Sequence, residues 1–119
     1  MDIGTQLYQA AIDLIETRYP LGWGGCAALR LASGEIITSV APDTKNDGLS
    51  LCMEVGSVLE AHKRDVAVTH SLCICRADET ADFKVLSPCG ICQERLVHWG
   101  GDVQVAVTHA GTDLMFKPL

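Results

Sequence analysis

Two short cysteine motifs constrain this chain most, because each stands where loop sequence gives way to a predicted helix. The first is Cys-Met-Glu at 52–54 and the second is Pro-Cys-Gly-Ile-Cys at 88–92. Partial positive charge at a helix N-terminus lowers the pKa of a thiol and favours the thiolate, which is the form that binds zinc. The sulfurs of Cys89 and Cys92 can converge on one ion, and Cys52 can supply a third. The chain is therefore expected to bring two helix starts together.

Three protein ligands and one open position are typical of catalytic zinc, whereas structural zinc usually has four ligands. The open position would hold a water whose pKa the metal lowers. Glu54 lies two residues after Cys52, so its carboxylate is expected to enter the same cavity without bonding to the metal. There it can take a proton from the water and pass it to a leaving nitrogen. We predict Cys52, Cys89 and Cys92 as zinc ligands and Glu54 as the catalytic proton shuttle.

The same residues have simpler interpretations. A Cys-x-x-Cys pair can be a structural zinc knuckle or a redox motif, and Glu54 can be a first-turn carboxylate favoured by the helix dipole. The presence of Glu54 together with Pro88 before the pair favours catalysis. The other cysteines are expected to be small buried apolar residues, and the histidines lack ligand spacing. These remaining residues are Cys26, Cys73, Cys75, His62, His70, His98 and His109.

Apolar spacing and turn residues predict an alternating pattern of helices and strands. After an opening helix and a hairpin, helices alternate with strands, which implies a sheet with helices on both faces. A short turn around 110–111 joins the last two strands, so this pair should be antiparallel, since a parallel crossover needs a longer connection. The expected helices are about 2–19, 51–63 and 90–99, and the expected strands are 26–31, 35–40, 66–75, 103–107 and 114–116.

Length and charge limit the class of protein. The chain has 119 residues and is 48% hydrophobic, which suits one domain spanning 1–119 with a single core. Its formal charge of −6 disfavours a polynucleotide partner, because an acidic surface repels phosphate backbones. No apolar run approaches the roughly 20 residues needed to span a membrane, and no secretory signal is visible. We expect a cytoplasmic protein whose cysteines stay reduced.

The combination of Cys-x-Glu with Pro-Cys-x-x-Cys resembles the cytidine deaminase family, in its three-cysteine branch. Residues 25–29, Gly-Cys-Ala-Ala-Leu, look like the family's first strand, and 52–63 and 85–100 are similar to a bacterial subgroup labelled blasticidin S deaminase-like. The resemblance implies an α/β fold, a three-layer α/β/α arrangement with a mixed five-stranded sheet. It further implies one zinc ion per subunit, hydrolytic deamination of free cytidine or deoxycytidine, a place in pyrimidine salvage, and a homotetramer or homodimer.

Four further residues take substrate-binding positions through this resemblance. Trp23 falls where the family has a Phe beside the nucleoside, and Asp43 falls where the family has a ribose-binding Glu. The backbone near Met53 and Ser87 would bind the edge of the pyrimidine. From the residues alone, Trp23 can be a core residue or an exposed stacking surface, and its glycine-rich setting and family position favour a pocket wall. Asp43 can simply be a turn former.

The chain departs from the family pattern at three further positions. Ala41 replaces an Asn that pairs with the ribose-binding Glu, and Met53 replaces the usual Ala. These changes leave open a different substrate, such as blasticidin S or another modified cytosine nucleoside. A non-catalytic zinc-binding or interaction module is a third interpretation. Val55 replaces an Arg that often lies beside the thiolates, so we expect helix N-termini or backbone amides to offset their charge.

Overall fold

The computed structural model describes residues 2–108 and 114–119 of the chain. The helices of this part are α1 (Ile3–Arg18), α2 (Val55–Arg64) and α3 (Gly90–Leu96), with 3-10 turns η1 (Asp47–Leu49) and η2 (Val97–Trp99). Its strands are β1 (Gly24–Leu31), β2 (Ile36–Ser39), β3 (Val68–Arg76), β4 (Lys84–Val85), β5 (Gln104–Ala106) and β6 (Phe116–Pro118).

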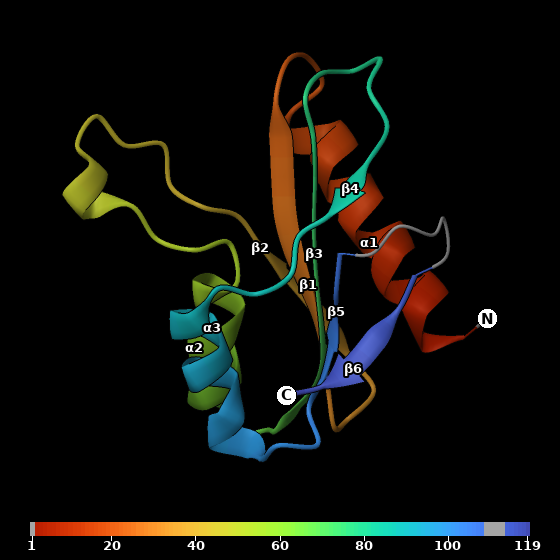
Figure 1. The fold of residues 1–119 in the computed structure, drawn as a ribbon, viewed down its shortest axis with the longest axis vertical. Helices are drawn as coiled ribbons and strands as arrows, with labels where there is room; N and C mark the ends of the chain where they lie inside the picture. The colour runs from red at the N-terminus through yellow and green to blue at the C-terminus, as the bar shows by residue number, and fades with distance from the viewer. Residues whose placement is uncertain (1, 109–113) are drawn as a thin grey trace.

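The described strands form one mixed sheet in the order β2-β1-β3-β5-β6, with β4 paired to β3 (Figure 1). Strand β3 is central: it pairs antiparallel with β1 and parallel with β5. Strands β5 and β6 are antiparallel, as predicted, whereas the expected turn at 110–111 lies outside the described residues. The prediction of five strands was one short among the described residues, because β4 has two residues and leaves no periodic signal.

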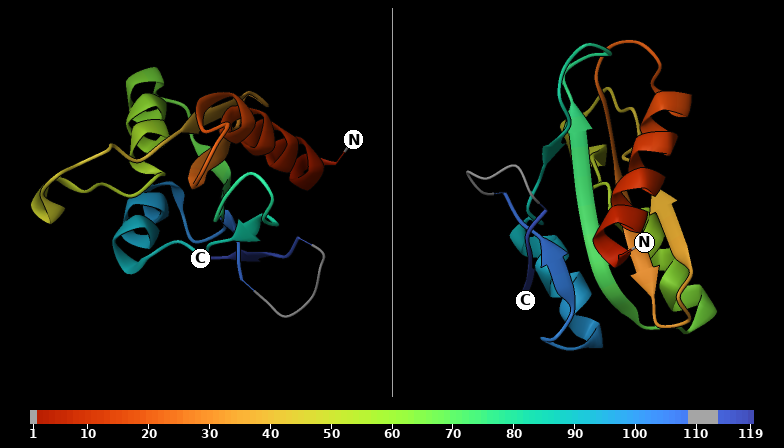
Figure 2. Two further views of the ribbon diagram at one scale, coloured as in Figure 1. Left: turned by 90° about the horizontal axis from the view of Figure 1, so that it is seen from above. Right: turned by 90° about the vertical axis from the view of Figure 1, so that its right-hand side faces the viewer.

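Helices cover both faces of the sheet, which confirms the predicted three-layer α/β/α arrangement. Helix α1 lies on one face, and α2 and α3 lie together on the other (Figure 1 and Figure 2). Successive residues of a strand point to opposite faces, so β1 contributes to both layers of core. Cys26 and Ala28 pack with α1, whereas Ala27 and Leu29 pack with α2 and α3.

Local hydrogen bonds define the starts of α1 and α2. Asp2 caps α1, since its carboxylate accepts a hydrogen bond of 2.8 Å from the backbone N–H of Thr5. Helix α2 begins at Val55, later than the predicted residue 51. Before the helix, the chain makes a tight turn in which the backbone N–H of Val55 donates a hydrogen bond of 3.1 Å to the carbonyl of Cys52. Cys52 therefore lies in the loop just before the helix, and Glu54 lies at its N-cap.

None of the helices that the structure describes combines the length and the apolar character needed to cross a bilayer.

Candidate active site

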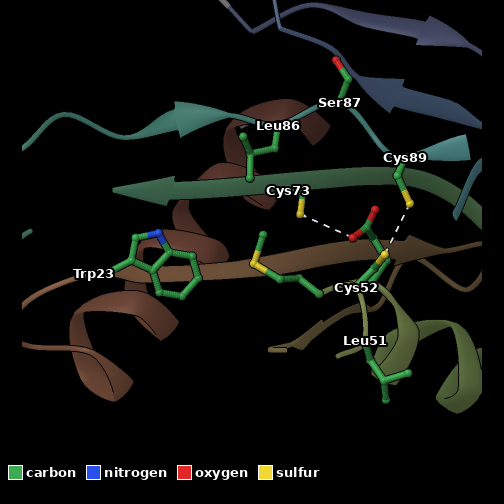
Figure 3. A pocket seen from close by; sticks show the side chains of 9 residues that line it. Trp23, Leu51, Cys52, Cys73, Leu86, Ser87 and Cys89 are labelled. Atoms are coloured by element: carbon green, nitrogen blue, oxygen red, sulfur yellow. Dashed lines mark hydrogen bonds between the residues drawn. The ribbon is translucent and has the colours of Figure 1, made fainter. Parts of the chain in front are cut away.

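The three predicted zinc ligands meet where the loop before α2 approaches the start of α3. Their Sγ atoms all lie within 4.8 Å of one another, and those of Cys52 and Cys89 are 3.3 Å apart (Figure 3). Cys89 is the N-cap of α3, and Cys92 lies buried in its first turn. Three convergent sulfur donors fit zinc, which prefers tetrahedral thiolate and imidazole sites and here would keep one position free.

The thiols of this cluster differ in acidity. Backbone N–H groups in the first turn of α3 lower the pKa of Cys89, and that of Cys92 has the largest effect. Burial raises the pKa of Cys92, and a hydrogen bond with Cys89 is the main cause that raises the pKa of Cys52. The expectation that helix starts favour all three thiolates therefore holds for Cys89 alone. A metal that binds here has to displace the protons that these thiols carry.

Arg95 lies beside the cluster and was missed in the sequence. Its guanidinium Nη1 is 3.5 Å from the Sγ of Cys92, and the side chain is half-buried. The pKa of Arg95 is raised, first by this hydrogen bond and further by the charges of Cys92 and Cys52. The signal was the spacing of three residues from Cys92, which puts both side chains on one face of a helix.

The carboxylate of Glu54 is almost fully buried, with 4% of the residue exposed. The Sγ of Cys73, on β3, donates a hydrogen bond of 3.5 Å to its Oε1 (Figure 3). Burial raises the pKa of Cys73, so the thiol keeps its proton and can act as a donor. Cys73 is buried, as predicted for this residue, and it also holds one oxygen of Glu54, which the sequence did not reveal.

A pocket of about 260 Å³ opens beside these groups. At one end lie the sulfurs of Cys52 and Cys89 with Glu54, and Ser87 lies at the rim (Figure 3). The rest of the wall is largely apolar and comes from Trp23, Leu51, Met53 and Leu86. An apolar cavity with a few convergent polar groups is the usual form of a small-molecule site.

Gly25 on β1 makes room for the pocket wall. A Cβ at this position would lie 2.8 Å from the Sδ of Met53 and 2.8 Å from the ring of Trp23. Both distances are far below van der Waals contact, so the two side chains can meet over β1 only because residue 25 is glycine. The indole of Trp23 is held from its other side by an edge contact with Tyr19, at 6.0 Å between ring centroids, and stays 53% exposed.

The four predicted substrate residues separate into two groups. Trp23, Met53 and Ser87 line the pocket with Glu54. Asp43 is not among the lining residues: it lies in an exposed loop, where its carboxylate is 3.5 Å from the guanidinium of Arg18. The structure therefore does not bring Asp43 to the pocket of its own chain, and a role in substrate binding stays a prediction.

Known structures resemble this chain along nearly its whole length. The crystal structure of the cytidine deaminase from Bacillus anthracis is 56% identical in sequence, with a TM-score of 0.96, over 98% of this chain and 84% of that one. The chain belongs to the cytidine deaminase family. This confirms the family predicted from the two cysteine motifs. No family model and no curated protein sequence matches the chain.

More distant cytidine deaminases share the fold. The enzyme from Mycobacterium leprae has a TM-score of 0.72 at 20% identity, over 98% of this chain and 94% of that one. The enzyme from Burkholderia pseudomallei has a TM-score of 0.72 at 18% identity, over 99% and 93%. As a cytidine deaminase-type hydrolase, the chain is a zinc enzyme, and the cluster of Cys52, Cys89 and Cys92 is positioned to bind the metal.

Proposed function

We propose that this chain hydrolyses the exocyclic amine of a free cytosine nucleoside, converting cytidine or deoxycytidine to uridine or deoxyuridine with release of ammonia. One zinc ion per subunit would be held by Cys52, Cys89 and Cys92, and residues 1–119 would act as a single domain. The observation that carries the proposal is the placement of a buried carboxylate, Glu54, beside three convergent sulfurs at the end of an apolar pocket.

In this proposal Glu54 moves every proton of the reaction. The bound metal supplies Lewis-acid activation of the attacking water. Glu54 accepts one proton as that water adds to C4 of the base and delivers it to ring N3. It then accepts the second proton, from the new hydroxyl group on C4, and delivers it to the amine, which leaves as ammonia. Glu54 is almost fully buried, and the Cys73 thiol holds one of its carboxylate oxygens by a hydrogen bond.

The apolar wall would hold the base. Trp23 offers a broad, partly exposed ring face, and the backbone near Met53 and Ser87 would bind the pyrimidine edge. We expect Trp23→Ala to raise KM for cytidine about tenfold with a smaller change in kcat, because stacking of a base on an aromatic ring contributes roughly 1–3 kcal/mol. Steady-state absorbance assays measure both constants. Trp23→Phe is the matched control and should keep KM near that of the parent, whereas an unchanged KM in Trp23→Ala would contradict the assignment.

One observation favours a second candidate substrate. Among the residues that the structure describes, the lining of the pocket holds no carboxylate besides Glu54 that could bind ribose hydroxyls, since Asp43 lies elsewhere. These described residues do not by themselves select a ribose, and blasticidin S or another modified cytosine nucleoside is the alternative. Comparing kcat/KM for cytidine, deoxycytidine and blasticidin S, by ultraviolet absorbance and ammonia release, decides between them. Bound zinc with no ammonia released from any cytosine nucleoside would instead support the non-catalytic module.

The remaining predictions concern the setting of the enzyme. A small-molecule partner agrees with the net negative charge of the chain and with the size of the pocket. No polynucleotide or membrane partner is proposed. A homotetramer or homodimer, a cytoplasmic location and a place in pyrimidine salvage stay predictions. Sedimentation of the zinc-loaded protein measures the first of these.

A further inference from the structure

The proposed site concentrates negative charge. Three thiolates carry one charge more than a zinc ion neutralises, and the carboxyl group of Glu54 is buried beside them. Val55, which directly follows Glu54 and is 8% exposed, is apolar and contributes no charge. The backbone N–H groups at the start of α3 are directed at Cys89. A group that offsets the charge on the remaining sulfurs is therefore required.

Arg95 is placed to provide that charge. Side chains in a helix lean towards its N-terminus, so a residue three positions after Cys92 reaches back over the sulfur one turn earlier. The Nη1 atom of Arg95 donates a hydrogen bond of 3.5 Å to the Sγ of Cys92. Within the described part of the chain, the ion pairs that form do not include Arg95, so no carboxylate there competes for its guanidinium.

We propose that Arg95 is a positioning residue of the zinc centre and that it acts through Cys92. Its guanidinium offsets thiolate charge, which the apolar residue at position 55 does not. The inference rests on the proposed function only in that Cys92 is taken as a zinc ligand. A guanidinium keeps its charge at all working pH values and is weakly hydrated, which suits a half-buried contact with sulfur. Arg95 itself does not touch the reacting atoms.

The hydrogen bond has two consequences for the metal. It withdraws electron density from the sulfur, so the zinc stays a stronger Lewis acid than it would with three unmodified thiolates. It also stabilises the negatively charged, metal-loaded cluster relative to the metal-free cluster. Loss of groups that support metal ligands typically lowers metal affinity or activity by about 10–100-fold.

The test compares Arg95→Gln, Arg95→Lys and the unaltered protein in zinc affinity and in the spectrum of the cobalt-substituted protein. Zinc affinity is measured by competition with a chromophoric chelator. We expect Arg95→Gln to bind zinc at least tenfold more weakly and to shift the thiolate-to-cobalt charge-transfer band to longer wavelength, because the sulfur becomes more electron-rich. Arg95→Lys keeps the charge and should recover most of the zinc affinity. The kcat of zinc-loaded Arg95→Gln should fall with little change in KM.

A charge control comes from Lys63→Gln, which removes one positive charge from an exposed position in the last turn of α2. This variant should keep the zinc affinity and the cobalt band of the unaltered protein. The inference is overturned if Arg95→Gln keeps a zinc affinity within twofold and an unchanged cobalt band, or if Lys63→Gln loses as much affinity. Either result leaves the proposed function intact. That function fails separately if the unaltered protein binds no zinc or releases no ammonia.

Discussion

Replacing Glu54 with glutamine should lower kcat for cytidine by about 10²–10⁴-fold while zinc stays bound, the range typical of general acid–base catalysis. Glutamine has nearly the same shape as glutamate but cannot accept and release a proton. The position is buried and receives the Cys73 thiol as a donor, so the amide can keep this contact through its oxygen. The expected loss is therefore chemical and not structural.

Two measurements on one sample separate these effects. Ammonia release gives the rate, and elemental analysis gives zinc per chain, which should equal that of the unaltered protein. Glu60→Gln is the matched control, since Glu60 lies on α2 in exposed ion pairs with Lys63 and Arg64. It should retain the full rate. Near-normal deamination by Glu54→Gln would exclude the proposed proton shuttle.

Replacing Cys92 with serine should reduce bound zinc from one ion per chain to nearly none and abolish deamination. A serine hydroxyl stays protonated near neutral pH and is a poor ligand for zinc compared with a thiolate. Cys92 is also fully buried, so no neighbouring solvent-exposed group can easily replace it. Zinc content and ammonia release measured together check the prediction, and stoichiometric zinc in the variant would contradict it.

The same variant should be less stable to heat. A metal held by Cys52 and by the start of α3 connects two segments that lie far apart in the chain, and metal binding energy adds directly to folding energy. Removing zinc with a chelator should therefore lower the Tm of the parent protein and leave that of Cys92→Ser unchanged. Cys75→Ser is the control, because Cys75 on β3 lies outside the cluster and should keep its zinc.

The fold was largely predictable because its signals are local. Leu7, Ala11 and Ile15 recur at helical spacing, and the structure buries all three against the sheet. The first hairpin was marked by its turn at 33–34, where Gly34 has a φ of +93°. Strand β4 could not be predicted in this way, because its two residues are held only by pairing with β3.

The convergence of the candidate metal ligands could be predicted from the sequence, whereas the side chains around them could not. Cys89 and Cys92 are one helical turn apart in the chain, so their convergence follows from local geometry. Arg95 was not predicted, because helix N-termini or backbone amides were expected to offset the charge of the thiolates. Asp43 was assigned by its place in a family pattern, and the loop that carries it runs outward to Arg18.

By itself, the sequence determined the candidate donor chemistry, namely three cysteine sulfurs at or near helix starts with a glutamate two residues after the first. Covalent spacing and helix geometry are enough for that. Only the tertiary structure decided that Cys52 lies 3.3 Å from Cys89, that Cys73 donates to Glu54, and that Trp23 and Met53 form one wall. These contacts join segments far apart in the chain, and their distances are set by the pairing of β1 with β3 and the packing of α2 against α3.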